Sequence, residues 1–330
     1  MKSRILKFFI VLIIVVGIIT IYEFTKPTEV GEVLVKVGSL KGPTSIGMIK
    51  MIDEKQSLDT NVNVDYTIVT TNDDMLSKLE TYEFDFACVP VNVAANLYNK
   101  GIKFQNIGVV CLNNLYIVGK DENIQNISDL KNKTINITSK GATPDILIQY
   151  LLKENGVGVD DPVYPTLDYS LAQVELTQAI LTDKANFAVL PEPFVTQALA
   201  KNSELKILFD LQEEFEKING ENTKITQSCI VVKEEFANEN PKLVKEFIEK
   251  YKISNNFVNT ERETAGEISE KYGLGITKDS AGQAIKRANL TYISAKDAKE
   301  DVEKFLGILY EFAPKSIGGK IPDEGFYYLK

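Results

Sequence analysis

The sequence contains no histidine and no tryptophan, and it has only three cysteines in 330 residues. Without histidine the chain cannot form a Ser–His or Cys–His nucleophile pair, and it lacks an imidazole general base. The commonest zinc and non-haem iron ligand sets are excluded for the same reason. Aromatic stacking on a ligand would have to come from tyrosine or phenylalanine. We therefore expect a binding protein rather than an enzyme, with no cofactor and no metal ion.

Basic residues are also in the minority. The chain has 37 lysines and arginines against 46 acidic residues, which gives a formal charge of -9. This balance argues against nucleic acid as a partner, because phosphates require a basic surface. The 44% of hydrophobic residues is normal for a globular protein, and the length allows two domains together with an anchor.

The N-terminus has the pattern of a membrane-targeting segment. Three basic residues among the first seven precede an apolar run at 8–22, which is short for a complete membrane span. The positive charges favour the cytoplasmic side, so the rest of the chain is expected on the outer face of the cytoplasmic membrane, extracellular or periplasmic. No A-x-A-like cleavage site or lipid-accepting cysteine follows. We favour an anchor at 1–26 and a linker at 27–32, with a cleaved signal peptide and a secreted protein as the alternative.

The cysteines are Cys88, Cys111 and Cys229. An odd number in an exported protein indicates at least one free thiol. Cys88 and Cys111 each end an apolar run with the pattern of a strand, so we interpret them as small buried hydrophobic residues. A disulfide between these two stays open as an alternative.

Beyond the linker, runs with the pattern of strands alternate with runs with the pattern of helices, which predicts an α/β fold with mostly parallel sheets. A second unit opens near Gly119, and Thr143 is expected to cap a helix that has Pro144 at its first position. After Glu234 the pattern is nearly all helical. The expected strands lie at 33–37, 62–69, 84–89, 107–111 and 115–118 in the first unit, and at 134–137, 187–190, 205–209 and 225–232 beyond it.

Four segments together resemble type II periplasmic binding proteins of ABC importers, in the branch that takes up nitrate, sulfonates, taurine and thiamine precursors. The segment 124–133 is similar to the "DLKGK" entry into the second lobe, and 138–143 to a ligand-gripping loop. The run 186–194 resembles "DAAVLPEPF", and 240–244 resembles the start of "NPELVKKFL". The resemblance extends over about 33–312 in consistent order.

This resemblance implies two α/β lobes, two hinge crossovers and a ligand cleft between the lobes. We expect lobe one at 33–118 plus 229–330 and lobe two at 119–228. The hinge is expected near Val118-Gly119 and Gln227-Ser228.

Ligands of open α/β sheets lie beyond the carboxyl ends of strands, where helix N-termini offer free N–H groups to anionic oxygens. Three loops have this position, and the hydroxyls of Thr44 and Thr143 could add donors, although both residues could equally be plain helix caps. The candidate residues in these loops are Ser39, Leu40, Lys41, Gly42 and Thr44, then Pro90 and Asn92, then Lys140, Gly141, Ala142 and Thr143.

Two further side chains are candidates. Glu192 stands between two prolines after a buried strand, where it could bind an amine or amino-pyrimidine group, or simply cap the helix that follows. Asn114 could read a polar ligand group or form a turn. Tyr116 and Tyr169 are candidate aromatic walls, with core or surface positions as the alternative.

The resemblance therefore implies the substrate-binding component of an ABC import system. We expect a monomer that captures a small anionic or zwitterionic organic solute, such as an aliphatic sulfonate or taurine, and delivers it to a permease. A thiamine-precursor aminopyrimidine is the alternative ligand. An enzyme like the related pyrimidine synthases is a weaker alternative, since those depend on histidine. A sensor role that acts through a partner is the third reading.

Overall fold

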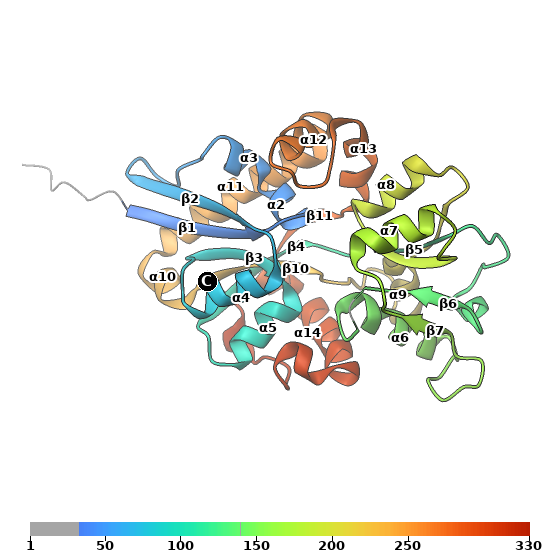
Figure 1. Cartoon of the computed structure of the whole chain (residues 1–330). Coiled ribbons are helices and arrows are strands. Elements are labelled where there is room, and N and C mark those ends of the chain that lie inside the picture. The colour runs from blue at the N-terminus through green and yellow to red at the C-terminus, as the bar shows by residue number, and fades with distance from the viewer. Residues whose placement is uncertain (1–32, 139) are drawn as a thin grey trace, which may run out of the picture.

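The computed structural model describes residues 33–138 and 140–330. These residues form two α/β halves that lie side by side, each built on its own β-sheet (Figure 1). The expected anchor and linker lie outside the described residues. Within 33–138 and 140–330, no helix has both the length and the apolar character needed to cross a membrane.

The first half contains a six-stranded sheet in the order β11-β4-β10-β3-β1-β2. Strand β1 runs parallel to β2 and β3, whereas β10 is antiparallel to both of its neighbours, and β11 is antiparallel to β4. The strands are β1 (Val33–Leu40), β2 (Val62–Val69), β3 (Phe86–Pro90), β4 (Phe104–Cys111), β10 (Ser228–Lys233) and β11 (Leu290–Ser294).

The second half contains a five-stranded sheet in the order β7-β6-β8-β5-β9. Strand β6 is parallel to β7 and β8, and β5 is antiparallel to β8 and β9. The strands are β5 (Leu115–Gly119), β6 (Thr134–Asn136), β7 (Thr166–Asp168), β8 (Phe187–Pro191) and β9 (Lys206–Asp210).

Both sheets are therefore mixed, and the expectation of mostly parallel sheets was wrong. The antiparallel strands include β5 and β10, the two strands that the chain forms directly after passing from one half to the other. A strand that enters a sheet from outside need not follow the parallel direction that strand–helix–strand crossovers impose. The expected all-helical region after residue 234 is interrupted by the short edge strand β11, whose Thr291, Tyr292 and Ile293 favour extended backbone.

Helices cover both sheets (Figure 1). In the first half they are α2 (Pro43–Gly47), α3 (Ile49–Asp53), α4 (Asn72–Glu80), α5 (Val91–Asn99), α10 (Glu234–Glu239), α11 (Pro241–Thr260), α12 (Arg262–Lys271), α13 (Lys278–Arg287) and α14 (Ala295–Phe312), followed by the 3-10 turns η2 (Pro314–Ile317) and η3 (Glu324–Phe326). In the second half they are η1 (Ile127–Leu130), α6 (Thr143–Glu154), α7 (Gln173–Leu181), α8 (Phe194–Lys201) and α9 (Leu211–Asn219).

The chain passes between the halves twice. The first crossing occupies 112–114, between β4 and β5, and the second occupies 220–227, between α9 and β10. The first crossing lies earlier than the expected position near Val118-Gly119, because β5 pairs entirely within the second sheet. The second crossing is tied to the end of β4, just before the first crossing, where the Gln227 N–H donates to the carbonyl of Cys111 at 2.9 Å.

Helix α14 of the first half also packs against the second half. Its Phe305 and Leu309 belong to the same buried cluster as Leu147 and Leu151 of α6. Burial of this apolar surface joins the two halves. One of the hydrophobic clusters thus continues across the boundary between the halves.

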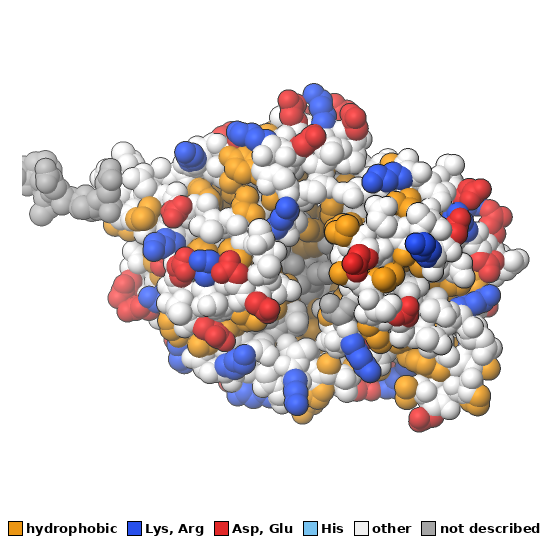
Figure 2. Space-filling view, viewed as in Figure 1, with side chains coloured by type: hydrophobic (Ala, Val, Ile, Leu, Met, Phe, Trp, Pro, Cys, Tyr) orange, Lys and Arg blue, Asp and Glu red, His pale blue; other side chains and the backbone are white. Residues whose placement is uncertain are grey.

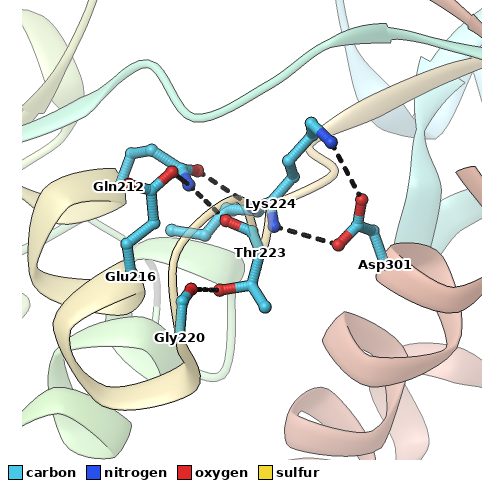
Figure 3. A network of polar contacts seen from close by, with 7 residues as sticks. Gln212, Glu216, Gly220, Thr223, Lys224 and Asp301 are labelled. Atoms are coloured by element: carbon cyan, nitrogen blue, oxygen red, sulfur yellow. Dashed lines mark hydrogen bonds and ion pairs between the residues drawn. The ribbon is translucent and has the colours of Figure 1, made fainter.

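Polar contacts hold the second crossing to the same helix (Figure 3). The carboxylate of Asp301 on α14 accepts the backbone N–H of Lys224 at 3.1 Å and lies 3.4 Å from its ammonium group. On the other side, Gln212 of α9 donates to the carbonyl of Thr223 at 2.6 Å. The return segment is therefore fixed between α9 and α14 before it enters β10.

The cysteines are buried and free, so the alternative of a disulfide between Cys88 and Cys111 was wrong. Cys88, Cys111 and Cys229 belong to three different hydrophobic clusters. Burial raises the pKa of Cys111 to about 12, and the pKa of Cys88 and Cys229 is raised for the same reason. They act as small hydrophobic residues, as the strand pattern indicated.

Candidate functional site

A cavity of about 670 Å³ lies between the two halves. Figure 2 shows the groove that separates the two halves on this face of the molecule. The first half contributes Leu40, Lys41, Gly42, Pro43, Thr44, Thr70, Asn72, Pro90, Ser228, Gly273, Leu274 and Gly275, the second half contributes Gln173, Pro191, Glu192, Pro193, Phe194 and Gln197, and the crossings contribute Asn114 and Gln227.

Some of the candidate residues predicted from the sequence line this cavity, and others do not. Seven of them line it: Leu40, Lys41, Gly42, Thr44, Pro90, Asn114 and Glu192. The other six do not lie among its lining residues: Ser39, Asn92, Lys140, Gly141, Ala142 and Thr143. The carboxyl ends of β1, β3 and β8 all meet at this cavity, which explains why loops after these strands were good candidates.

The loop after β1 is stabilised by its own hydroxyl groups. Thr44 donates to the carbonyl of Leu40 at 2.5 Å, and Ser45 donates to the same carbonyl at 2.6 Å. Ser39 is buried, with its Oγ 2.8 Å from the Oγ of Ser45. Gly42 has φ 118° and ψ -146°, a region that essentially only glycine adopts. These contacts fix the turn that places Lys41 at the edge of the cavity.

The loop before α6 is held by a carboxylate from the first turn of that helix. Asp145, which is only 1% exposed, accepts the backbone N–H of Gly141 at 2.6 Å and the hydroxyl of Tyr169 at 2.7 Å. The expected helix cap at Thr143 was wrong, because the N-cap position is Ala142 and no side chain caps this end. Lys140 lies 5.9 Å from the centroid of the Tyr169 ring. The start of α6 thus carries a buried carboxyl group whose partners lie within the chain itself.

Glu192 is 2% exposed and joins the two halves. Its carboxylate accepts the hydroxyl of Thr196 at 2.9 Å and the N–H of Thr196 at 3.2 Å, in the first turn of α8. Arg287 of α13 approaches the same carboxylate at 3.6 Å and donates to the Thr196 hydroxyl at 3.0 Å. Burial raises the pKa of Glu192 to about 7, against the lowering effect of Thr196 and Arg287. Glu192 therefore accepts hydrogen bonds in the first turn of α8 and also lines the cavity.

Asn114 is 4% exposed and lies in the first crossing. Its backbone carbonyl accepts the N–H of Glu192 at 3.0 Å, while its side chain forms no hydrogen bond with any residue in the described part of the chain. Tyr116 is not an aromatic wall of the cavity, since its hydroxyl donates to the carbonyl of Arg287 at 2.9 Å. Tyr169 does not line the cavity either, and its hydroxyl donates to Asp145 of α6.

Several lining residues were not predicted from the sequence. Phe194 supplies the aromatic side chain that Tyr116 and Tyr169 do not, and it ends the motif at 186–194. Gln173 opens α7, and Gln227 precedes β10. The loop Gly273-Leu274-Gly275 lies between α12 and α13, and both glycines have positive φ. Two glycines this close together in the sequence indicate a tight loop.

No group of three or more His, Cys, Asp or Glu side chains in 33–138 and 140–330 is placed to hold a metal ion. The charged residues on the cavity wall are Lys41 and Glu192. The wall otherwise carries neutral polar and apolar side chains, which suits a small organic ligand.

Two α/β halves, two chain crossings and a cavity between the halves define the type II periplasmic-binding-protein fold. The chain belongs to the NMT1/THI5-like family, whose model matches residues 58–259. Comparison with the curated proteins gives no match.

Solved structures share this fold. A crystal structure described as an ABC transporter from Parabacteroides distasonis is 30% identical, with a TM-score of 0.77, and the alignment covers 90% of this chain and 99% of that one. The periplasmic aliphatic sulphonate binding protein SsuA from Escherichia coli is 16% identical, with a TM-score of 0.71 and coverage of 88% and 92%. The alkanesulfonate-binding protein SsuA from Xanthomonas axonopodis pv. citri is 14% identical, with a TM-score of 0.63 and coverage of 89% and 96%. These neighbours are transporter components and binding proteins rather than enzymes, as the sequence indicated for this chain.

Proposed function

We propose that the chain is the extracytoplasmic substrate-binding component of an ABC import system. The observation that carries this proposal is the cavity of about 670 Å³, whose wall combines both halves with both crossings. A solute bound there contacts the two halves at once, so its binding energy favours the closed arrangement. A permease can then distinguish the loaded from the empty protein by its shape. The family and the 30%-identical ABC transporter structure support this setting.

In this proposal the halves are the two lobes of the binding protein. Lobe one consists of 33–111 plus 228–330, and lobe two of 115–219. The ligand contacts are the candidate residues that line the cavity, whereas Ser39, Asn92 and the loop 140–143 are not among its lining residues. The chain acts as a monomer on the outer face of the membrane, held there or secreted by its N-terminal segment.

The proposed solute is a small anionic or zwitterionic organic molecule of the aliphatic sulfonate or taurine type. Among the described lining residues, Lys41 has no acidic partner within ion-pair distance, so its ammonium group is free for an anion. Glu192 offers a second, negative charge that is already shared with Arg287. Opposite charges at separate places on one wall suit a zwitterion. The two neighbours described as sulfonate-binding share the fold and thereby support this choice.

An aminopyrimidine of the thiamine-precursor type is the second candidate. Phe194 on the cavity wall favours it, because a ring face of this kind can stack on a planar heterocycle. Glu192 could accept a hydrogen bond from the exocyclic amine if its contact with Arg287 loosened.

The test is a thermal-shift screen of the full-length chain with taurine, alkanesulfonates, nitrate, amino acids and aminopyrimidines. A ligand at 100 times its dissociation constant should stabilise the folded state by about 2.7 kcal/mol. Small-angle scattering with the best compound should show a smaller radius of gyration as the lobes close. Lack of stabilisation by every compound would contradict the proposed solutes, and turnover of a hit would contradict a pure binding role.

A further inference from the structure

Three carboxamide side chains stand on the cavity wall without hydrogen bonds. They are Asn114 in the first crossing, Gln227 in the second crossing and Gln173 at the start of α7. Each has one fully enclosed amide atom that finds no partner in the described part of the chain: Oδ1 of Asn114, Oε1 of Gln227 and Nε2 of Gln173. An enclosed amide atom without a partner costs about 1–3 kcal/mol, so three on one wall require an explanation.

The backbones that carry the two crossing carboxamides are fixed. The carbonyl of Asn114 accepts the N–H of Glu192, and the carbonyl of Gln227 accepts the N–H of Val91 at 3.0 Å. The terminal bond of an amide side chain rotates easily, because its torsional preference is broad. The chain therefore holds these amides at defined places and leaves each free to turn its donor or its acceptor toward a ligand.

The charge nearby favours a neutral or donor-rich group at this end of the cavity. The backbone N–H of Glu192 donates to the carbonyl of Asn114, so this amide lies next to a carboxyl group that already faces Arg287. Lys41, the cation among the described lining residues, follows β1 instead, so this part of the wall offers no unpaired positive charge to an anion. A sulfonate has only acceptor oxygens and would leave the amide oxygens unpaired. A group with an N–H donor beside an acceptor can pair with both atoms of a carboxamide at once.

We propose that Asn114, Gln173 and Gln227 form the specificity-determining wall of the cleft. They select a solute that carries, besides an anionic group near Lys41, a neutral group with a donor and an acceptor side by side, such as an amide or a urea. This inference rests on the proposed function and narrows its solute class.

The test compares four sulfonates on the full-length chain by calorimetry: ethanesulfonate, taurine, pentanesulfonate and 2-ureidoethanesulfonate. Pentanesulfonate matches the ureido compound in length without its donors and acceptor. We expect the ureido compound to bind at least about tenfold more tightly than pentanesulfonate, since it gains at least one hydrogen bond to a group otherwise unpaired.

Variants then assign the preference to the carboxamides. Asn114→Leu and Gln227→Leu keep a similar volume, and each should remove most of the preference for the ureido compound over pentanesulfonate. Gln227→Glu removes the NH₂ donor at nearly identical shape. It replaces the leucine variants in this test if their melting temperatures are too low for binding measurements. Gln178→Leu is the control, because Gln178 is an exposed carboxamide of the same helix as Gln173.

Equal binding of pentanesulfonate and the ureido compound would overturn this inference and leave the proposed binding function intact. A preference that survives in Asn114→Leu and Gln227→Leu would also overturn it. No binding of any of the four compounds would contradict both this inference and the sulfonate-type solute of the proposed function.

Discussion

Arg287 and Glu192 connect the two lobes beside the ligand cavity. The guanidinium of Arg287, at the end of α13 in lobe one, lies 3.6 Å from the Glu192 carboxylate in lobe two. It also donates to the hydroxyl of Thr196, which itself donates to Glu192. Since Glu192 is 2% exposed, its charge depends on these few partners rather than on water. The contact therefore stabilises the arrangement in which the lobes approach each other on this side.

Replacing Arg287 should loosen this connection. We expect Arg287→Met to lower the free energy of unfolding by roughly 1–3 kcal/mol, because the buried Glu192 loses its cation. The radius of gyration of the unliganded protein should increase, and ligand affinity should fall. Lys286→Met is the matched control, since Lys286 is exposed on the same helix. Equal effects of both variants would show that the contact between Arg287 and Glu192 contributes nothing specific.

The raised pKa of Glu192 predicts a pH dependence of stability. Because the folded-state pKa is about 7, above the ordinary 4.5, the folded protein holds this proton more tightly than the unfolded chain. The stabilising contribution is complete below about pH 4.5 and is lost as the pH rises to about 7. Wild type should thus lose roughly 3 kcal/mol relative to Glu192→Gln across this window. Denaturant unfolding of both proteins at several pH values measures the difference, and parallel curves would contradict the prediction.

Asp301 should control the order of the second crossing. Its carboxylate accepts the N–H of Lys224 and faces the lysine ammonium group (Figure 3). Asp301→Ala should destabilise the protein by about 1 kcal/mol and increase amide hydrogen exchange in 224–227. Glu300→Ala, at an exposed neighbouring position, should leave exchange in this segment unchanged. Unchanged exchange in the Asp301 variant would mean that the crossing is fixed by other contacts.

Gly42 should be required for the turn that carries Lys41. Its φ of 118° strains any other residue, so Gly42→Ala should cost about 1–3 kcal/mol and weaken ligand binding by displacing the start of α2. Gly282→Ala provides a control of opposite sign. Gly282 lies within α13 with open space around it, so alanine should stabilise the helix by about 0.5–1 kcal/mol. Thermal unfolding of both variants checks the pair, and similar melting temperatures would contradict the role of Gly42.

The local order of elements could be predicted from the sequence. The strand at 62–69 was predicted with its exact bounds, and most others within a few residues, because the apolar pattern reports burial along the chain itself. The same pattern indicated which loops follow buried strands, and the residues Lys41, Pro90 and Glu192 from three such loops line one cavity. The motif order predicted the type II binding-protein fold, and the family and the structural neighbours confirm it.

What the sequence could not determine depends on which elements meet in space. Membership of β5 in the second sheet, and with it the position of the first crossing, follows from pairing with β8 and β9. The partner of Glu192 is an arginine on a helix far away in the sequence, and the N–H of Gly141, just before α6, is paired with Asp145. Hydrophobic periodicity indicates which residues are buried. Hydrogen bonds and ion pairs are short-ranged, so they depend on where both partners lie after packing. Only the tertiary structure therefore decided which polar groups are already paired and which remain free to bind a ligand.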